Sequence, residues 1–516
     1  YRLSTREKVS VARTVVIDEC SMLTEEQLAA VLDAVKGVER LILVGDPQQL
    51  PPIGAGRPFL DIVRQLRPDD AEAIFPRVAP GYAELTIQRR QLGRQRDDLL
   101  LASWFSGRPT DAGADEVWSR VASGSSDHLC FVRWDSGDEL QERLLEVLAE
   151  QLGIREGEEE LCFEQSVGGQ VYGKTCYFWA GRDTDDQGRR NGGACLKAAS
   201  WQILSPVRNY AFGVPALNRM LQQRFRQQTL QYAQQAWGRR IPKPMGPEGI
   251  LYGDKVINVA NHRHYQVWPK EDALAYVANG EICIVVGQFK TKNARYPGQP
   301  WQLEVEFSSQ PGYAYSYGKD HFREEGSPTL ELAYALTVHK AQGSEFGVTF
   351  VVLPNPCRLL SRELLYTALT RQQERIVVLH QGELHNLRRF SEDYYSESAR
   401  RLTNLFRPPS PTEVRDRFLE EGLIHRTRTG ECVRSKSEVI IADLLYSKGI
   451  EYAYESLLLG KDGLPRYPDF TIIDDASGQT VYWEHLGMMR VPSYRERWLR
   501  KREWYREQGI LPYTEG

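Results

Sequence analysis

Two adjacent carboxylates, Asp18 and Glu19, directly follow the short apolar segment VVI at 15–17. This pattern predicts acids at the carboxyl end of a buried parallel strand, where open α/β sheets bind ligands. Phosphoryl transfer from ATP needs one acid to hold Mg²⁺ and another group to activate the attacking water. We assign Asp18 to the first role and Glu19 to the second, although strand ends often carry acids and the pattern alone is weak.

The residues that follow strengthen this interpretation. Thr24 and Gln27 form a capping-box pattern at the start of a predicted helix. A second apolar strand at 41–44 then ends in GDPQQLPPI at 45–53. Two successive strand ends with these residues resemble motifs II and III of superfamily 1 helicases. The resemblance implies that Gln49 senses the γ-phosphate of ATP.

Further motifs of this family follow in the family's order. They are motif IV (LTIQRRQ, 85–91), the segment after it (ILSPVRN, 203–209), motif V (ALTVHKAQGSEF, 335–346) and motif VI (LLYTALTRQQERIVVL, 364–379). The chain therefore resembles the RecD-like branch, in which two RecA-like lobes enclose ATP. The resemblance implies 5′→3′ movement on DNA. It also implies that Arg90 and Arg371 deliver positive charge to the transferring phosphate, which suits a guanidinium.

The motif V segment, 335–346, carries hydroxyl, amide, imidazole and ammonium groups. Such groups hold phosphates without reading bases. The resemblance places Gly343 at the nucleotide, and it implies that the nucleic-acid backbone is contacted by Thr337, His339, Lys340, Gln342 and Ser344.

A second apparent nucleotide motif, GGQVYGKT at 168–175, matches the phosphate-loop pattern but is expected to be false. A working phosphate loop joins a buried strand to a helix, so that backbone N–H groups face the phosphates. The residues before Gly168 are too polar for a central strand, and those after Thr175 lack a helical period. We expect the true loop upstream of Tyr1.

Two further segments interrupt the motor motifs. Strand-like runs at 253–261, 279–287 and 302–308 are bounded by Asn-Gly and Gly turn signals. The resemblance implies an SH3-like barrel over 250–328 that contacts single-stranded DNA, with a purely structural barrel as the alternative. Segment 106–200 carries no recognised motif and is interpreted as an insertion of unknown role.

The C-terminal region begins after the Pro-rich stretch RPPSPTE at 407–413, which predicts a linker. A turn within 475–478 would place Asp469 directly opposite Glu484 in a β-hairpin. Facing carboxylates repel each other in a structural sheet, but they suit a divalent cation bound between them. Glu438 on the preceding helix is the predicted third ligand of Mg²⁺.

The segments PDF at 468–470 and WEHLG at 483–487, with the acid on the preceding helix, resemble the PD-(D/E)XK nucleases. The usual lysine position holds Leu486, which is a departure from the family pattern. Lys501 on the following helix is the candidate to orient the attacking water, and His485 is the runner-up. Ordinary surface acids, or an inactive nuclease-like domain that binds DNA, are the alternatives.

Composition limits the other possibilities. The chain has 516 residues, 41% of them apolar and 26% charged, which is ordinary for a globular protein. Apolar runs stay well below the roughly 18 residues of a membrane helix. Eight scattered cysteines without a CxxC pair favour a reducing, cytoplasmic location. Six basic residues and no acid lie between Arg219 and Lys243, which favours a polyanionic partner although the net charge is −4.

The predicted fold is α/β throughout. RecA-like helicase lobes of the P-loop NTPase fold carry an inserted SH3-like β-barrel and a C-terminal restriction-endonuclease-like αβ domain. The predicted domains are 1–105 (the C-terminal part of the first lobe), 106–200 (the insertion), 201–249 with 329–406 (the second lobe), 250–328 (the barrel), 407–429 (a linker) and 430–516 (the nuclease-like domain).

The predicted function is ATP- and Mg²⁺-dependent movement along, or unwinding of, DNA. The expected partner is single-stranded DNA or duplex ends, without a membrane. Mg²⁺-dependent DNA cutting is expected to be coupled to this movement, in repair, recombination or restriction of foreign DNA. One alternative is a non-catalytic DNA-binding subunit with an inactive motor, which a phosphate loop encoded upstream of Tyr1 would exclude. The other alternative is an RNA helicase.

Overall fold

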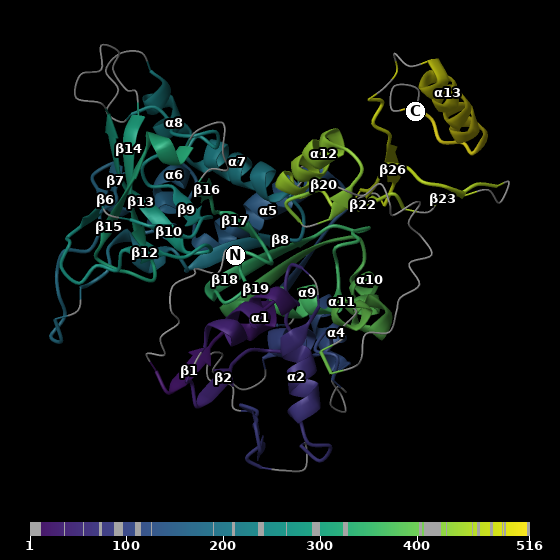
Figure 1. Cartoon of the computed structure of the whole chain (residues 1–516). Coiled ribbons are helices and arrows are strands. Elements are labelled where there is room, and N and C mark those ends of the chain that lie inside the picture. Colours follow the sequence, from purple (N-terminus) through teal and green to yellow (C-terminus); the bar gives the residue numbers. More distant parts are fainter. Residues whose placement is uncertain are drawn as a thin grey trace. The chain divides into compact units, whose positions relative to one another are not determined.

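The computed structural model divides the chain into two compact units (Figure 1). Unit 1 comprises Tyr1–Asn355 and Leu359–Arg407, and unit 2 comprises Pro356–Arg358 and Pro408–Gly516. The described residues are 12–35, 37–54, 56–71, 75–86, 96–108, 115–124, 126–188, 190–208, 212–235, 242–264, 266–290, 300–322, 329–401, 405–406, 425–429, 431–456, 458–461, 465–474, 478–487, 489 and 492–512. Within these ranges, every helix is too short or too polar to cross a membrane.

Unit 1 begins with a two-stranded parallel sheet, drawn in purple in Figure 1. β1 (Thr14–Ile17) pairs with β2 (Arg40–Leu43), and α1 (Glu25–Ala34) lies between them in the sequence. The capping box at Thr24 is present, so the predicted helix start is confirmed. The predicted burial of the strands is not found, since Val16 is 59% exposed. Residues alternate between exposed and half-buried, which is the pattern of a sheet covered on one face.

A five-stranded parallel sheet forms the second part of unit 1. Its strand order is β17-β8-β18-β19-β5, and each neighbouring pair runs parallel. The central strands are almost entirely buried, as expected for a parallel sheet. In the order of the sheet, the strands are β17 (Ala335–Thr337), β8 (Trp201–Ser205), β18 (Phe346–Leu353), β19 (Gln372–Gln381) and β5 (Leu129–Trp134).

The edge strand β5 corrects the interpretation of 106–200 as a separate insertion. β5 pairs with β19 from Leu129↔Ile376 to Trp134↔Gln381, so this segment completes the parallel sheet. α5 (Gly137–Leu152) follows and contacts β5. The run LCFVRW has no motif of its own, and only its partner β19 identifies it as part of the sheet.

The other helices and hairpins of unit 1 are short. The helices include α7 (Val214–Phe225), which contacts β17, and α9 (Arg362–Ala368) in the motif VI segment. The remaining α-helices are α2 (Pro58–Leu66), α3 (Asp97–Ser103), α4 (Glu116–Ser123), α6 (Glu159–Ser166), α8 (Gln227–Gln234), α10 (Leu384–Arg388) and α11 (Glu397–Arg400). Single turns of 3₁₀-helix lie at Cys20–Met22, Ala194–Lys197, Lys319–Phe322, Arg389–Ser391 and Asp393–Tyr395. A small hairpin pairs β3 (Val78–Ala79) with β4 (Tyr82–Ala83).

The segment expected to form a barrel is rich in β-structure. Its strands form an antiparallel sheet with the order β11-β15-β14-β13-β9-β16, whose last strand, β16, lies beyond the predicted end of this segment at residue 328. The strands are β11 (Val267–Trp268), β15 (Ala314–Gly318), β14 (Pro300–Phe307), β13 (Ile282–Lys290), β9 (Lys255–Asn258) and β16 (Leu330–Leu332). A separate pair joins β10 (His262–Arg263) to β12 (Tyr276–Val277).

The apparent phosphate loop at 168–175 is part of a β-hairpin. β6 (Gln170–Tyr172) pairs with β7 (Thr175–Tyr177), and Gly173 occupies the turn with φ +67°. A phosphate loop requires a helix directly after its Lys-Thr pair. A strand follows here instead, so the interpretation of this match as false is confirmed at the level of structure.

Unit 2 is a small αβ unit. Its three-stranded antiparallel sheet has the order β22-β25-β26, with β22 (Tyr452–Tyr454), β25 (Phe470–Ile473) and β26 (Thr480–Trp483). Its helices are α12 (Lys436–Ser447) and α13 (Pro492–Glu507), and its shorter strands are β20 (His425–Arg426), β21 (Cys432–Val433), β23 (Leu458–Leu459) and β24 (Pro465–Arg466). A core formed by Val433, Ala442, Leu445, Tyr454 and Phe470 holds helix and sheet together.

Candidate functional site

The two acids after β1 occupy a tight turn. Glu19 has φ 54°, in the left-handed region, and its N–H donates to Asp18 Oδ1 at 2.8 Å. The N–H of Cys20 donates to the carbonyl of Val44, which ties this turn to the end of β2. Non-glycine residues with positive φ are uncommon and concentrate at functional sites. The turn leaves Asp18 exposed and Glu19 half-buried.

The motif III segment, 45–53, folds around the Asp46 carboxylate. Asp46 Oδ1 accepts the Gln48 N–H at 3.0 Å, and Oδ2 accepts the Tyr366 hydroxyl at 3.1 Å. Burial and the nearby Asp46 raise the pKa of Tyr366, so its phenol remains a donor. Gln49 Nε2 donates weakly to Asp46 Oδ2 at 3.4 Å. Gln49 Oε1 is buried without a hydrogen-bond partner among the described residues, which leaves this amide incompletely satisfied.

Leu50 connects the motif III segment to motifs V and VI. Its N–H donates to Thr367 Oγ1 at 2.9 Å, and its carbonyl accepts Gln342 Nε2 at 2.9 Å. Leu50 and Thr367 are both fully buried. Both backbone polar groups of one residue are therefore satisfied by segments about 300 positions later in the chain.

Gly343 of the motif V segment lies against Glu19. It has φ +77°, and a Cβ atom at this position would lie 3.4 Å from Glu19 Oε1. A side chain here would be strained by the positive φ, although its Cβ would lie at an ordinary contact distance from the carboxylate. Gly343 thus allows the motif V backbone to approach Glu19, the predicted general base. The contact of Gly343 with the nucleotide stays a prediction.

Arg371 is 2% exposed and is held by its own lobe. Its Nε donates to the Thr367 carbonyl at 2.9 Å, and its terminal nitrogens donate to the Ser344 carbonyl at 3.3 Å and to Thr370 Oγ1 at 3.1 Å. The guanidinium therefore organises motifs V and VI in this conformation. The other predicted arginine, Arg90, lies outside the described residues.

The side chains predicted to contact nucleic acid make internal contacts. Lys340 Nζ forms an ion pair with Glu331 Oε2 at 2.6 Å, and Gln342 is bonded to Leu50. Thr337 Oγ1 accepts the Lys340 N–H at 3.3 Å. Burial lowers the pKa of His339, which favours a neutral imidazole. The Ser344 carbonyl accepts from Arg371, and the nucleic-acid role of all five residues stays a prediction.

Sequence reasoning missed three residues that connect these motifs: Leu50, Tyr366 and Thr367. Each lies inside a recognised motif; Leu50 follows Gln49, and Tyr366 and Thr367 lie in the helix segment before Arg371. A hydroxyl within the otherwise apolar helix segment LLYTAL was the available signal, since a buried hydroxyl needs a hydrogen-bond partner.

In unit 2, the pairing of β25 with β26 matches the predicted register. Phe470 faces Trp483, so Asp469 and Glu484 are the next opposed pair. The His485 N–H donates to Asp469 Oδ2 at 2.6 Å. Burial, together with the Glu484 carboxylate, raises the pKa of Asp469 to about 7. The two acids therefore interact unfavourably across the hairpin, as the sequence predicts.

Lys501 reaches this acidic pair from α13. Its Nζ lies 2.5 Å from Glu484 Oε1 and donates to the Tyr467 carbonyl at 3.0 Å. The hydroxyl of Tyr505, one turn further along α13, donates to Glu484 Oε1 at 2.5 Å. The structure thus places Lys501 of α13 beside Glu484, and its role in orienting the attacking water stays a prediction.

The predicted third ligand, Glu438, is engaged elsewhere. Its Oε2 accepts the N–H groups of Arg434 and Ser435 and the hydroxyl of Tyr454, at 2.9–3.0 Å. No group of three or more His, Cys, Asp or Glu side chains in the described part of the chain is arranged to hold a metal ion. One oxygen of Glu438 caps its own helix, while the Glu438 charge still contributes to the raised pKa of Asp469, so its role as third ligand stays a prediction.

Two family models match this chain. Residues 1–73 match an AAA domain, and residues 332–379 match the UvrD-like helicase C-terminal domain. These regions contain the acids after β1 and the motif V and VI segments, respectively. Together with the parallel sheet, the AAA match supports a RecA-like fold for unit 1.

Several known proteins are similar to the chain. An uncharacterized protein of Methanocaldococcus jannaschii is 26% identical over 96% of this chain and 39% of its own length. The RecBCD enzyme subunit RecD of Mycolicibacterium smegmatis is 25% identical, covering 71% of this chain and 49% of that subunit. The ATP-dependent RecD2 DNA helicase of Deinococcus radiodurans is 26% identical, and the match covers 70% of this chain and 35% of that helicase. The chain thus spans at most about half the length of these relatives.

A solved structure of Pif1 helicase from Bacteroides with ADP-AlF3 and single-stranded DNA aligns over 71% of this chain and 70% of its own. Its sequence identity is 14% and its TM-score is 0.29. The relationship of the chain to known proteins therefore rests on the family models and the sequence relatives. They relate the chain to the RecD-like helicases of superfamily 1 and do not extend that relationship to a nuclease.

Proposed function

We propose that unit 1 is the motor of an ATP-dependent DNA helicase or translocase that moves 5′→3′. The observation that carries the proposal is the pair of hydrogen bonds made by Leu50 to Thr367 and Gln342. They connect the segment next to the predicted nucleotide site with both motifs of the other lobe. A motor needs such a connection, because nucleotide binding must change how its lobes contact each other.

The acids after β1 supply the proposed chemistry. Asp18 is exposed and offers the hard oxygen ligands that Mg²⁺ prefers. Bound Mg²⁺ would neutralise charge on the phosphates. Glu19 would accept a proton from the attacking water, beside the Gly343 backbone of the motif V segment. Gln49 Nε2, which donates only weakly to Asp46 at 3.4 Å, would instead donate to the γ-phosphate.

Arg371, and Arg90 from outside the described residues, are proposed to stabilise charge on the transferring phosphoryl group. In the described conformation Arg371 is bonded to Thr367, Thr370 and Ser344. Reaching a phosphate would require it to exchange some of these contacts. Lys340 would likewise exchange Glu331 for a backbone phosphate of DNA.

The proposal is tested by ATP hydrolysis measured with and without oligonucleotides. Single-stranded DNA should stimulate hydrolysis, because the bound strand and the nucleotide both act on the contact between the lobes. Oligo-dT and oligo-rU of equal length distinguish a DNA motor from an RNA motor. Binding of DNA without any hydrolysis would instead identify a non-catalytic subunit.

A second proposal concerns unit 2, as a Mg²⁺-dependent DNA nuclease. Its support is the opposed pair Asp469 and Glu484, with Lys501 placed at Glu484 by the next helix. The residues fit a site with two carboxylates better than the predicted set of three, since Glu438 is engaged in the helix cap. A bound divalent cation would stabilise the charged form of both acids.

The test of the second proposal is DNA cutting in Mg²⁺ and in EDTA. Asp469→Ala and Glu484→Ala should abolish Mg²⁺-dependent cutting while leaving ATP hydrolysis intact. Lys501→Ala should reduce cutting nearly as far, and His485→Ala should be milder, since His485 contacts Asp469 through its backbone. If both carboxylate variants still cut DNA, Asp469 and Glu484 have a structural role and the nuclease proposal is wrong.

A further inference from the structure

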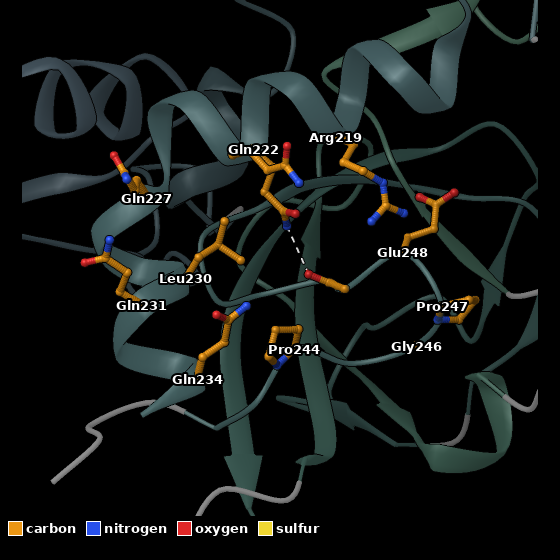
Figure 2. A pocket seen from close by; sticks show the side chains of 12 residues that line it. Arg219, Gln222, Gln227, Leu230, Gln231, Gln234, Pro244, Gly246, Pro247 and Glu248 are labelled. Atoms are coloured by element: carbon orange, nitrogen blue, oxygen red, sulfur yellow. Dashed lines mark hydrogen bonds between the residues drawn. The ribbon is translucent and has the colours of Figure 1, made fainter. Parts of the chain in front are cut away.

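Unit 1 has a polar cleft between two helices and a loop. The cleft has a volume of about 420 Å³ and lies between α7, α8 and residues 244–249. Figure 2 shows side chains from both helices turned toward it, with Pro244 and Pro247 on the loop side. Its volume falls within the range of roughly 300–1,000 Å³ that is common for small-ligand sites.

Glutamine amides dominate the lining. Gln223 on α7 and Gln227, Gln231 and Gln234 on α8 are exposed, and their amides make no hydrogen bond within the described residues. Gln222 differs, because its Nε2 donates to the Gly249 carbonyl at 3.0 Å and to Asp254 at 2.7 Å. Gln222 is therefore held in place by these bonds. The amides of the other four glutamines remain available as donors and acceptors for a ligand.

The charges around the cleft favour an anionic ligand. Arg219 lines it and forms no ion pair with the described residues. The one lining carboxylate, Glu248, accepts the Leu332 N–H at 2.6 Å, and burial raises its pKa. The start of α8 is closed to anions, because Glu160 accepts the N–H groups of Gln228 and Thr229. Arg219 is therefore the lining group suited to a phosphate.

The cleft also adjoins the predicted nucleic-acid contacts. Glu248 holds Leu332, and the preceding residue, Glu331, forms the ion pair with Lys340. Arg208 lies 3.7 Å from the same Glu331 carboxylate. A chain whose phosphates lie at Lys340 and Arg208 would thus pass beside this cleft.

We propose that the cleft between α7 and α8 binds one nucleobase of a single strand, with Arg219 on its phosphate. An amide offers a donor and an acceptor in one plane, the pattern that glutamine uses toward adenine. Leu230 and the two prolines supply apolar surface for the faces of the base. Three basic residues of this run, Arg219, Arg224 and Lys243, are exposed, which favours a polyanion over a peptide. Arg226 is buried in ion pairs with Glu164 and Asp254 and does not contribute. The identity of the polymer rests on the proposed function.

The experiment measures binding of a fluorescent oligo-dA to the full chain by anisotropy. The double variant Gln227→Ala/Gln231→Ala removes two cleft amides and no charge. It should weaken binding roughly 10-fold, as expected for a lost amide–base pair. The slope of log affinity against log salt should not change, because the number of phosphate contacts is the same. Arg219→Ala should weaken binding and reduce that slope by about one.

The matched control is Gln228→Ala/Gln235→Ala, which removes two exposed amides beside the cleft but outside its lining. It should bind like the wild type, and thermal melts should show all variants folded. An oligonucleotide with abasic positions should lose affinity for the wild type but not for the Gln227/Gln231 variant.

Equal affinity of the cleft variant and wild type for oligo-dA would overturn the proposal and favour a peptide ligand. An equal abasic penalty in both proteins would also overturn it. If DNA does not stimulate hydrolysis but binding still depends on the cleft glutamines, the proposed motor function is wrong and the proposed nucleobase site stands. If the wild-type protein binds no oligonucleotide, both proposals are wrong.

Discussion

The backbone N–H of Leu50 donates to the hydroxyl of Thr367 across 317 positions of the sequence. Both residues are fully buried, so neither group can exchange this partner for water. Tyr366 makes a second contact to the same segment, at Asp46. The motif VI helix therefore contacts the motif III segment through two adjacent side chains, and one hydroxyl substitution tests this connection.

Thr367→Val should disrupt the contact between these segments. The substitution keeps the shape of the side chain and leaves the Leu50 N–H buried without an acceptor, at a cost of about 1–3 kcal/mol. We expect a lower melting temperature and reduced DNA-stimulated ATP hydrolysis. The control is Thr349→Val in β18, because Thr349 Oγ1 is buried without a partner in the described structure. Thr349→Val should be at least as stable as wild type, and equal losses in both variants would contradict the assigned role of Thr367.

Glu19→Gln should abolish ATP turnover while ATP binding is retained. It removes the proposed base and leaves Asp18 to hold Mg²⁺, so the rate should fall by at least ~10²-fold. Steady-state hydrolysis and nucleotide binding in the full-length protein measure the two effects. Glu26→Gln, an exposed acid on α1, is the control and should be silent. A Glu19 variant within a few-fold of wild type would remove this residue from the site.

Arg371→Lys should lower the hydrolysis rate more than the affinity for ATP. The guanidinium donates through three nitrogens to Thr367, Ser344 and Thr370, and one ammonium cannot span these acceptors. The melting temperature should fall as well. Arg375→Lys on the same strand is the control, since Arg375 Nε has no partner among the described residues. Normal rates and stability in Arg371→Lys would exclude both roles.

Lys174→Ala should leave ATP affinity and hydrolysis unchanged. Lys174 is exposed at the turn of the hairpin formed by β6 and β7, where no helix follows to bind a phosphate. Binding of a fluorescent ATP analogue to wild type and variant checks this. A loss of affinity of tenfold or more, about 1.4 kcal/mol, would restore the sequence match as a working phosphate loop.

Asp469→Asn should stabilise unit 2 at neutral pH in EDTA. The pKa of Asp469 is raised from 3.8 to about 7, so the folded state keeps a proton that the unfolded chain has lost. Stability should therefore fall as pH rises from about 4 to about 7, and remain low above that range. Asparagine keeps an acceptor for the His485 N–H and carries no charge, so this pH dependence should largely disappear.

Calorimetric melts across pH 4–8 measure this effect. The control is Glu503→Gln, an exposed acid on α13, whose removal should leave the pH dependence intact. Added Mg²⁺ should restore stability to the wild type at pH 8 if the pair binds the cation. A variant that is less stable than wild type at every pH would show that Asp469 supports the fold.

Local features of this protein can be predicted from its amino-acid sequence. The acids after β1, the capping box at Thr24 and the false phosphate loop follow from short patterns of neighbouring residues. The register that opposes Asp469 to Glu484 follows from the position of one turn, because each step along a hairpin fixes the next pair. Such features depend on backbone geometry over a few residues, so they can be predicted from the sequence.

Contacts between groups that are distant in the sequence depend on the three-dimensional fold. β5 belongs to the parallel sheet because it pairs with the edge of β19. The residues of β5 alone do not predict this pairing. Glu438 faces its own helix start and Tyr454, since a buried carboxylate takes the nearest donors. Leu50 finds Thr367 because two segments far apart in sequence bury each other's polar groups. A hydrogen bond depends on the position of both partners in space, and spacing along the chain fixes that position only for near neighbours.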